Sequence, residues 1–252
     1  MNNKLTCLAL FAICSLLLVP AAMADSACVT GTLNGGPQLY NSSYSCNINN
    51  ILDFSNFHLS QTPDQNSPTV SVNPIPPDPG VGLPAGELGF NFTGNWTSGN
   101  TEDVNISFNV AGVGGTEISD VYIFFQNVSA TGNEHAFYTE TIKDTDPTSS
   151  GFGKTITVNL KDPNSDEVYD VTKNFIDTKF GGPVDSISIS KDVAFDCGPT
   201  GTDTCTANAG ALMSGFGNAY SYTPEPRGLS LMLGLGLLVG LALFKRRAVA
   251  QN

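Results

Sequence analysis

Three oxygen-bearing side chains at alternate positions form the best metal-binding pattern in the sequence. The spacing of Asp162, Asn164 and Asp166 matches the first, third and fifth ligand positions of an EF-hand calcium loop. The pattern then stops, because Glu167 replaces the sixth-position glycine and Lys173 replaces the bidentate glutamate at the twelfth position. Asp-Pro-Asn is also ordinary turn chemistry. The sequence therefore predicts a structural turn and no cofactor, with weak surface calcium binding by these three residues as the alternative.

Catalytic motifs are missing from the sequence. His58 and His135 are the two histidines, and neither belongs to an H-E-x-x-H motif; no G-x-S-x-G motif occurs. A hydrolase would need a triad that joins one of these histidines to a distant serine and aspartate. We therefore expect a protein that is not an enzyme and has no catalytic residues, and keep a secreted hydrolase as the third option.

The N-terminal residues 1–24 have the features of a secretory signal peptide. Lys4 precedes an apolar run from Leu5 to Val19, and Ala22-Met23-Ala24 is a small-x-small cleavage site. A permanent membrane anchor is the alternative, which the short apolar run disfavours. The sequence thus predicts export and removal of this segment after Ala24.

Four cysteines remain after that cleavage. An exported chain meets an oxidising compartment, so two disulfides are expected, and four cysteines allow three connectivities. We favour Cys28–Cys46 and Cys197–Cys205, since each pair closes a short local loop. Neither pair has the C-x-x-C spacing of a zinc site.

The C-terminal segment has three features in a fixed order. A Pro-Glu-Pro tripeptide is followed by an uncharged span, residues 228–244, and then by a basic cluster. The residues of the tripeptide and of the cluster are Pro224, Glu225, Pro226, Lys245, Arg246 and Arg247. A helix over that span would be roughly 25 Å long, which is marginal for a hydrocarbon core of about 30 Å. The basic cluster predicts a cytoplasmic end, with the body of the protein outside.

This combination resembles the PEP-CTERM sorting signal of Gram-negative bacteria that secrete exopolysaccharide, and the resemblance covers residues 223–248. It implies that an exosortase recognises the tripeptide, cleaves near it and passes the ectodomain to the cell envelope or the extracellular matrix. The same kind of tail is also labelled an ice-binding-protein C-terminal domain, a label that implies no ice binding here.

The charge of the chain is unevenly distributed. The whole chain carries a net charge of -12, whereas residues 25–223 hold 6 basic and 22 acidic residues, a net charge of -16, and no arginine. Nucleic acids and other anionic partners need Lys/Arg clusters and are therefore excluded. Cations or neutral sugars are better candidates.

The remaining body, residues 25–222, has the pattern of an all-β domain. Short segments with period-two alternation or apolar runs are separated by Gly, Asp, Pro and Asn turns. These segments are 87–93, 104–110, 121–125, 136–142, 155–160 and 186–190. They predict an antiparallel β-sandwich flanked by the signal peptide and a single C-terminal transmembrane helix. The seven prolines between residues 62 and 84 predict a long surface loop.

Three stretches of the body, 45–48, 53–57 and 188–193, loosely resemble patterns in uncharacterised PEP-CTERM β-proteins. This resemblance implies the same fold and no particular activity. We therefore expect an exported, non-catalytic surface or matrix protein whose partners are an exosortase, the membrane through its C-terminal helix, and exopolysaccharide. The alternative is a neutral-glycan-binding module that stacks sugars on Trp96, Tyr122, Phe125 or Tyr138.

Overall fold

The computed structural model of the chain describes residues 26–33, 40–62, 70–75, 86–97, 103–163, 168–171, 179–197 and 209–224. The predicted signal peptide and the predicted transmembrane helix lie outside these residues. Among the described residues, no helix has the length and apolar character needed to cross a membrane. The strands are β1 (Gly31–Thr32), β2 (Ser45–Ile48), β3 (Leu52–Thr62), β4 (Ser71–Ile75), β5 (Leu88–Thr97), β6 (Asp103–Gly112), β7 (Thr116–Gln126), β8 (Ser129–Thr131), β9 (Glu134–Asp144), β10 (Thr155–Lys161), β11 (Val168–Asp170), β12 (Ser186–Cys197) and β13 (Gly210–Pro224).

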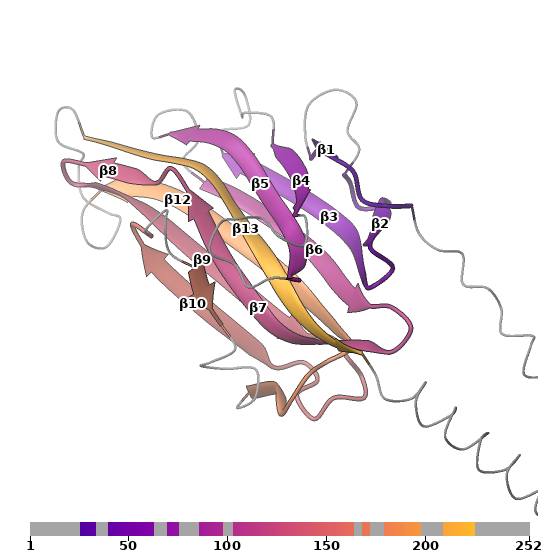
Figure 1. Cartoon of the computed structure of the whole chain (residues 1–252). Coiled ribbons are helices and arrows are strands. Elements are labelled where there is room, and N and C mark those ends of the chain that lie inside the picture. The colour runs from indigo at the N-terminus through magenta and orange to yellow at the C-terminus, as the bar shows by residue number, and fades with distance from the viewer. Residues whose placement is uncertain are drawn as a thin grey trace, which may run out of the picture.

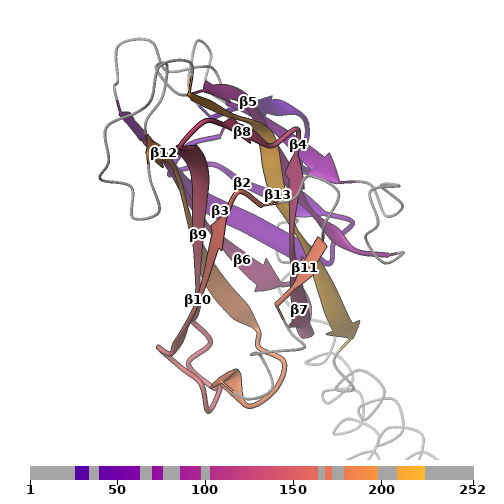
Figure 2. The ribbon, with the colours of Figure 1, turned by 90° about the vertical axis from the view of Figure 1, so that its left-hand side faces the viewer.

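The strands form two antiparallel sheets that face each other (Figure 1). Sheet A has the order β10-β9-β12-β6-β3-β2, and sheet B has the order β1-β4-β5-β13-β7-β11, with β8 also paired to β13. In Figure 2 strands β9, β10 and β12 lie on the left and strands β7, β11 and β13 on the right. The predicted all-β, two-sheet antiparallel architecture is confirmed.

Five of the six predicted segments fall inside a strand, namely β6, β7, β9, β10 or β12, and the sixth, 87–93, starts one residue before β5. The alternation is clearest in β6, where Val104, Ile106, Phe108 and Val110 are buried and the residues between them are partly exposed. Successive side chains of a strand point to opposite faces, so one row of β6 enters the core between the sheets.

A β-bulge in β3 brings two aromatic rings to the same side. Phe54 and Phe57 are an odd number of residues apart, so a regular strand would place them on opposite faces. The pairing with β6 shifts register between Ser55 and His58, and Asn56 has a positive φ of 58°. Both rings are therefore buried, and each packs against Phe90 of sheet B.

The proline-rich region differs from the prediction in one part. Residues 71–75, expected in a surface loop, form strand β4 between β1 and β5. Val70 and Val72 are fully buried, and this burial favours the strand. Pro74 is tolerated because β1 pairs only with Ser71 and Val72, so no β1 residue lies opposite the proline.

The longest strand was not anticipated from the sequence. β13 has 15 residues and pairs with β5 on one side and β7 on the other. Its backbone pairing reaches Pro224, which lies opposite Thr116 of β7. The sheet therefore continues two residues past the expected domain boundary at residue 222 and ends on the first residue of the predicted sorting tripeptide.

Candidate functional site

The carboxylate of Asp162 is already occupied in a side-chain and backbone network. Its Oδ2 lies 2.6 Å from Nδ1 of His135, and its Oδ1 accepts a hydrogen bond from the backbone N–H of Ala136 at 2.8 Å. The other two predicted calcium ligands, Asn164 and Asp166, lie outside the described residues. A calcium ion at Asp162 would have to compete with both contacts.

The two histidines have separate surroundings. His58 contacts the side chain of Asn56 at 3.0 Å, and His135 contacts Asp162 and the ring of Phe137. None of these partners is a nucleophile, so the described contacts of the histidines do not assemble a triad.

The first predicted disulfide is confirmed: Cys28 and Cys46 are bonded across a sequence separation of 18 residues. The bond fixes the N-terminal segment to β2, where Ala27 also bridges to Asn47. Cys197 is buried at the end of β12, and its predicted partner Cys205 lies outside the described residues. The second pairing therefore stays a prediction.

The aromatic side chains expected to stack against a glycan are mostly core residues. Trp96 and Tyr138 are fully buried and Phe125 is 2% exposed, so the hypothesis is wrong for these three. Tyr122 is half-buried against a small apolar cluster of Ile75, Phe124 and Ala219. The aromatic ring with a large exposed area in the described part of the chain is Phe152, at 61%, in the connection between β9 and β10.

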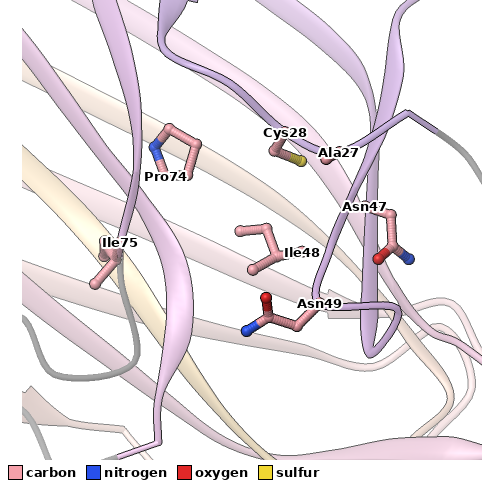
Figure 3. A pocket seen from close by; sticks show the side chains of 7 residues that line it. All are labelled: Ala27, Cys28, Asn47, Ile48, Asn49, Pro74 and Ile75. Atoms are coloured by element: carbon pink, nitrogen blue, oxygen red, sulfur yellow. The ribbon is translucent and has the colours of Figure 1, made fainter.

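A shallow, open hollow of about 270 Å³ lies beside the Cys28–Cys46 disulfide (Figure 3). Its lining residues are Ala27, Cys28, Asn47, Ile48, Asn49, Pro74 and Ile75. The amide of Asn47 is committed to the β2–β3 turn, since it donates to Asp53 and accepts from the backbone of Asn50. The hollow therefore offers a mostly apolar wall without a charged group.

The most unusual chemistry of the described residues lies in the core. Lys191 of β12 and Glu140 of β9 are opposite each other in sheet A, and Asn218 of β13 comes from sheet B. All three side chains are fully buried. We call these three residues the Lys–Glu–Asn cluster.

One carboxylate connects the cluster. Oε2 of Glu140 accepts a hydrogen bond from Nζ of Lys191 at 2.6 Å, and Oε1 accepts one from Nδ2 of Asn218 at 2.8 Å. The hydroxyl of Tyr138 donates to Oε2 of Glu140 and accepts from Nζ of Lys191 at 2.8 Å. Asn218 also donates to the backbone carbonyl of Tyr122 at 3.3 Å. The network thus links β9 and β12 of sheet A with β13 and β7 of sheet B.

Aromatic rings enclose the cluster and exclude water. The ammonium of Lys191 lies 5.5 Å from the ring centroid of Tyr138 and 5.7 Å from that of Phe216. Burial lowers the pKa of the Lys191 amine, although the charge and hydrogen bond of Glu140 oppose this shift. Burial, followed by the charge of Glu140, raises the pKa of Tyr138 and that of Tyr220 well above the usual value.

The sequence analysis missed this cluster although a signal was present. Ile187 and Ile189 set an inward row that places Lys191 in the core at the next position, and Ala136 and Tyr138 do the same for Glu140. A charged residue at an inward position of each of two strands indicates a buried pair.

The fold belongs to the class of antiparallel β-sandwiches, and comparison with known proteins adds only distant likenesses. No protein-family model matches the chain, and no curated protein is similar to it in sequence. Among solved structures, TmCBM61 in complex with β-1,4-galactotriose has a TM-score of 0.27 and 12% identity, over 66% of this chain and 88% of that one. A family 12 xyloglucanase from Bacillus licheniformis has a TM-score of 0.31 and 9% identity, over 78% of this chain and 100% of that one. With TM-scores this low, neither likeness assigns a ligand or an activity to this chain.

Proposed function

We propose that this chain is an exported, non-catalytic protein of the cell surface or extracellular matrix that an exosortase sorts and that associates with exopolysaccharide. In this proposal the predicted helix over residues 228–244 holds the chain in the membrane until an exosortase cleaves near the Pro-Glu-Pro tripeptide. The folded body is then left in the envelope or released into the matrix.

The Cys28–Cys46 disulfide carries this proposal. Disulfides persist in oxidising compartments and are rare in the reducing cytosol. The bond lies four residues after the predicted signal-peptide cleavage site at Ala24, so it would fasten the new N-terminus of the exported protein to β2.

The burial of the aromatic residues favours a structural role over the glycan-binding alternative. A sugar-stacking surface needs exposed aromatic faces. Trp96, Phe125 and Tyr138 instead pack in the core, where Trp96 lies 5.0 Å from Phe216 and Phe125 lies 4.8 Å from Tyr138 between ring centroids. These side chains stabilise the sandwich.

Fractionation of the native host tests the proposed sorting. An antiserum against the folded body follows the full-length chain through the cytoplasmic, membrane, surface and matrix fractions. We expect the wild-type protein at the surface or in the matrix without its C-terminal segment, and a Pro224→Ala/Glu225→Ala/Pro226→Ala variant in the membrane with that segment attached. Thr223→Ala, next to the tripeptide, is the matched control and should behave as the wild type. Equal distribution of the triple variant and the wild type would contradict the proposal.

A further inference from the structure

The Lys–Glu–Asn cluster carries chemistry that the proposed function does not use. We propose that Lys191 and Asn218 become joined by an intramolecular amide bond between Nζ and Cγ, with Glu140 as the catalytic proton-transfer group. The product is a covalent cross-link between β12 of sheet A and β13 of sheet B. This modification depends only on the folded core and not on export or sorting.

The geometry brings the nucleophile and the leaving group to the same carboxylate. The Lys191 amine is hydrogen-bonded to one oxygen of Glu140 at 2.6 Å, and the Asn218 amide nitrogen is hydrogen-bonded to the other at 2.8 Å. Glu140 is therefore in place to take a proton from the amine and to give one to the amide nitrogen, which is the task of a general acid–base group. The fixed positions of three buried side chains also remove most of the entropic cost of bringing them together.

Burial makes the neutral amine, which is the nucleophilic form of lysine, easier to reach at Lys191. The side chain of Lys191 is fully buried between the rings of Tyr138 and Phe216. Desolvation of this kind lowers the pKa of Lys191, and the adjacent carboxylate can accept the proton directly. A site without bulk water also protects the new amide bond from hydrolysis.

The amide of Asn218 is held in a defined orientation. Its Nδ2 donates to Glu140 and to the carbonyl of Tyr122, whereas its Oδ1 is buried and has no hydrogen-bond partner among the described residues. The hydroxyl of Tyr220, two residues along the same face of β13, is also unpartnered within the described structure. The Oδ1 atom of Asn218 is thus free to take up the negative charge that develops on it when the amine attacks Cγ.

The reaction is balanced without an oxidant, a reductant or a cofactor. Glu140 takes a proton from the Lys191 ammonium, and the free amine attacks Cγ of Asn218, so that the Nζ–Cγ bond forms and negative charge collects on Oδ1. Proton transfer through Glu140 from Nζ to Nδ2 then allows the Cγ–Nδ2 bond to break. The two protons that Nζ loses leave on the former amide nitrogen as one ammonium ion, and Glu140 ends as the carboxylate it was at the start.

The position of the cross-link gives it a mechanical meaning. Asn218 lies six residues before Pro224 on the last strand, which leads directly to the predicted sorting tripeptide and membrane helix. A force applied to the C-terminus would pull first on β13. A covalent bond from Asn218 to Lys191 would transfer this load to the opposite sheet. Without it, only non-covalent contacts would hold β13 in place.

Mass spectrometry of the full-length protein tests the cross-link. The protein is reduced and alkylated, and each variant is compared with the mass calculated from its own sequence. We expect the wild type to be lighter by one ammonia, about 17 Da, and Glu140→Gln and Asn218→Ala to have their full sequence masses. Lys143→Met, which removes an exposed lysine of β9, is the matched control and should keep the loss.

Tryptic mapping locates the bond and separates it from loss of ammonia elsewhere. Without the cross-link, trypsin produces residues 180–191 and 192–227 as two peptides. An acylated Lys191 is not cleaved, so the cross-linked protein should release residues 180–227 as one peptide that carries the mass loss. A full sequence mass and two separate peptides from the wild type would overturn the proposal, and a cross-link that persists in Glu140→Gln would overturn the role of Glu140.

Discussion

Lys191 and Glu140 face each other across β12 and β9 and form an ion pair of 2.6 Å inside the core, with both side chains fully buried. Each occupies an inward position of its strand, where the neighbouring inward residues are mostly apolar. The desolvation of two charges is compensated here by the hydrogen bonds of Tyr138 and Asn218 as well as by the attraction between the pair. The core of this sandwich is therefore held together by polar as well as apolar contacts.

Replacement of the buried Lys191 side chain should destabilise the protein strongly. Lys191→Met leaves the Glu140 carboxylate in the core without its partner, and the expected loss is about 3–5 kcal/mol in the free energy of unfolding. The double variant Lys191→Met/Glu140→Gln should recover part of this loss, because no charge then remains buried. Denaturant unfolding measures both, and exposed Lys143→Met is the control with an expected change of about 0.5 kcal/mol or less. An unchanged stability of Lys191→Met would show that the pair contributes nothing to the fold.

The confirmed disulfide should stabilise the body. A Cys28→Ser/Cys46→Ser variant loses the constraint on its unfolded state, and the loop-entropy model predicts a loss of about 3 kcal/mol for a loop of this size. Thermal unfolding without reductant compares the variant with the wild type. If the two midpoints coincide, the N-terminal segment unfolds independently of the two sheets.

Substitutions of a buried and of an exposed aromatic residue should differ in their effect on stability. Trp96 is fully buried, and its ring occupies space above Gly94, where a Cβ would approach the indole to 2.7 Å. Trp96→Ala should therefore cost about 3–5 kcal/mol through the cavity that it leaves.

Phe152→Ala is the matched surface variant, and it should leave unfolding unchanged because the side chain is 61% exposed. Binding assays on neutral glycans with both variants test the alternative function. Specific glycan binding that Phe152→Ala abolishes would favour a binding module over the structural role proposed for the chain.

The acidic pair Asp103 and Asp192 should make stability depend on pH. Burial, followed by the hydrogen bond and charge of Asp103, raises the pKa of Asp192 from 3.8 to about 6. The folded state thus favours the protonated carboxyl of Asp192. The stability that this preference contributes is fully present below pH 3.8 and is lost as the pH rises through about 6.

Asp192→Asn should remove this dependence and stabilise the protein at neutral pH by about 1 kcal/mol or less, a value that allows for the partial exposure of the side chain. Asp196→Asn removes one carboxylate from the same strand as a control. Thermal midpoints across pH 4–7 measure the effect, and parallel curves for wild type and Asp192→Asn would contradict it.

The strands were predictable because their side chains obey a local rule. In β6 and β10 the alternation of apolar and polar residues reports the two faces of a half-buried strand directly. The short spacing between Cys28 and Cys46 similarly favoured this local pair among the three possible connectivities, and the structure confirms it. These properties depend on residues that are close in the sequence.

The alternation of apolar and polar residues did not predict β13, because the packing of this strand requires glycine. A Cβ at Gly217 would approach the backbone oxygen of Phe90 to 2.4 Å as well as the ring of Phe124 to 2.2 Å, so the position favours glycine. Glycine lowers strand propensity and interrupts the alternation, and only the pairing of β13 with β5 and β7 shows it to be a central strand.

The alternating strands and the acidic, arginine-free composition of the body can be read from the amino-acid sequence, because charge and periodicity are properties of the chain alone. The contact between Lys191, Glu140 and Asn218, in contrast, arises from the packing of the two sheets. In the sequence, Lys191 is 51 residues and Asn218 is 78 residues from Glu140, whose carboxylate they share. No local pattern specifies which inward positions of two sheets come into contact. The packing of sheet A on sheet B makes that choice, and with it creates the reactive core proposed for this protein.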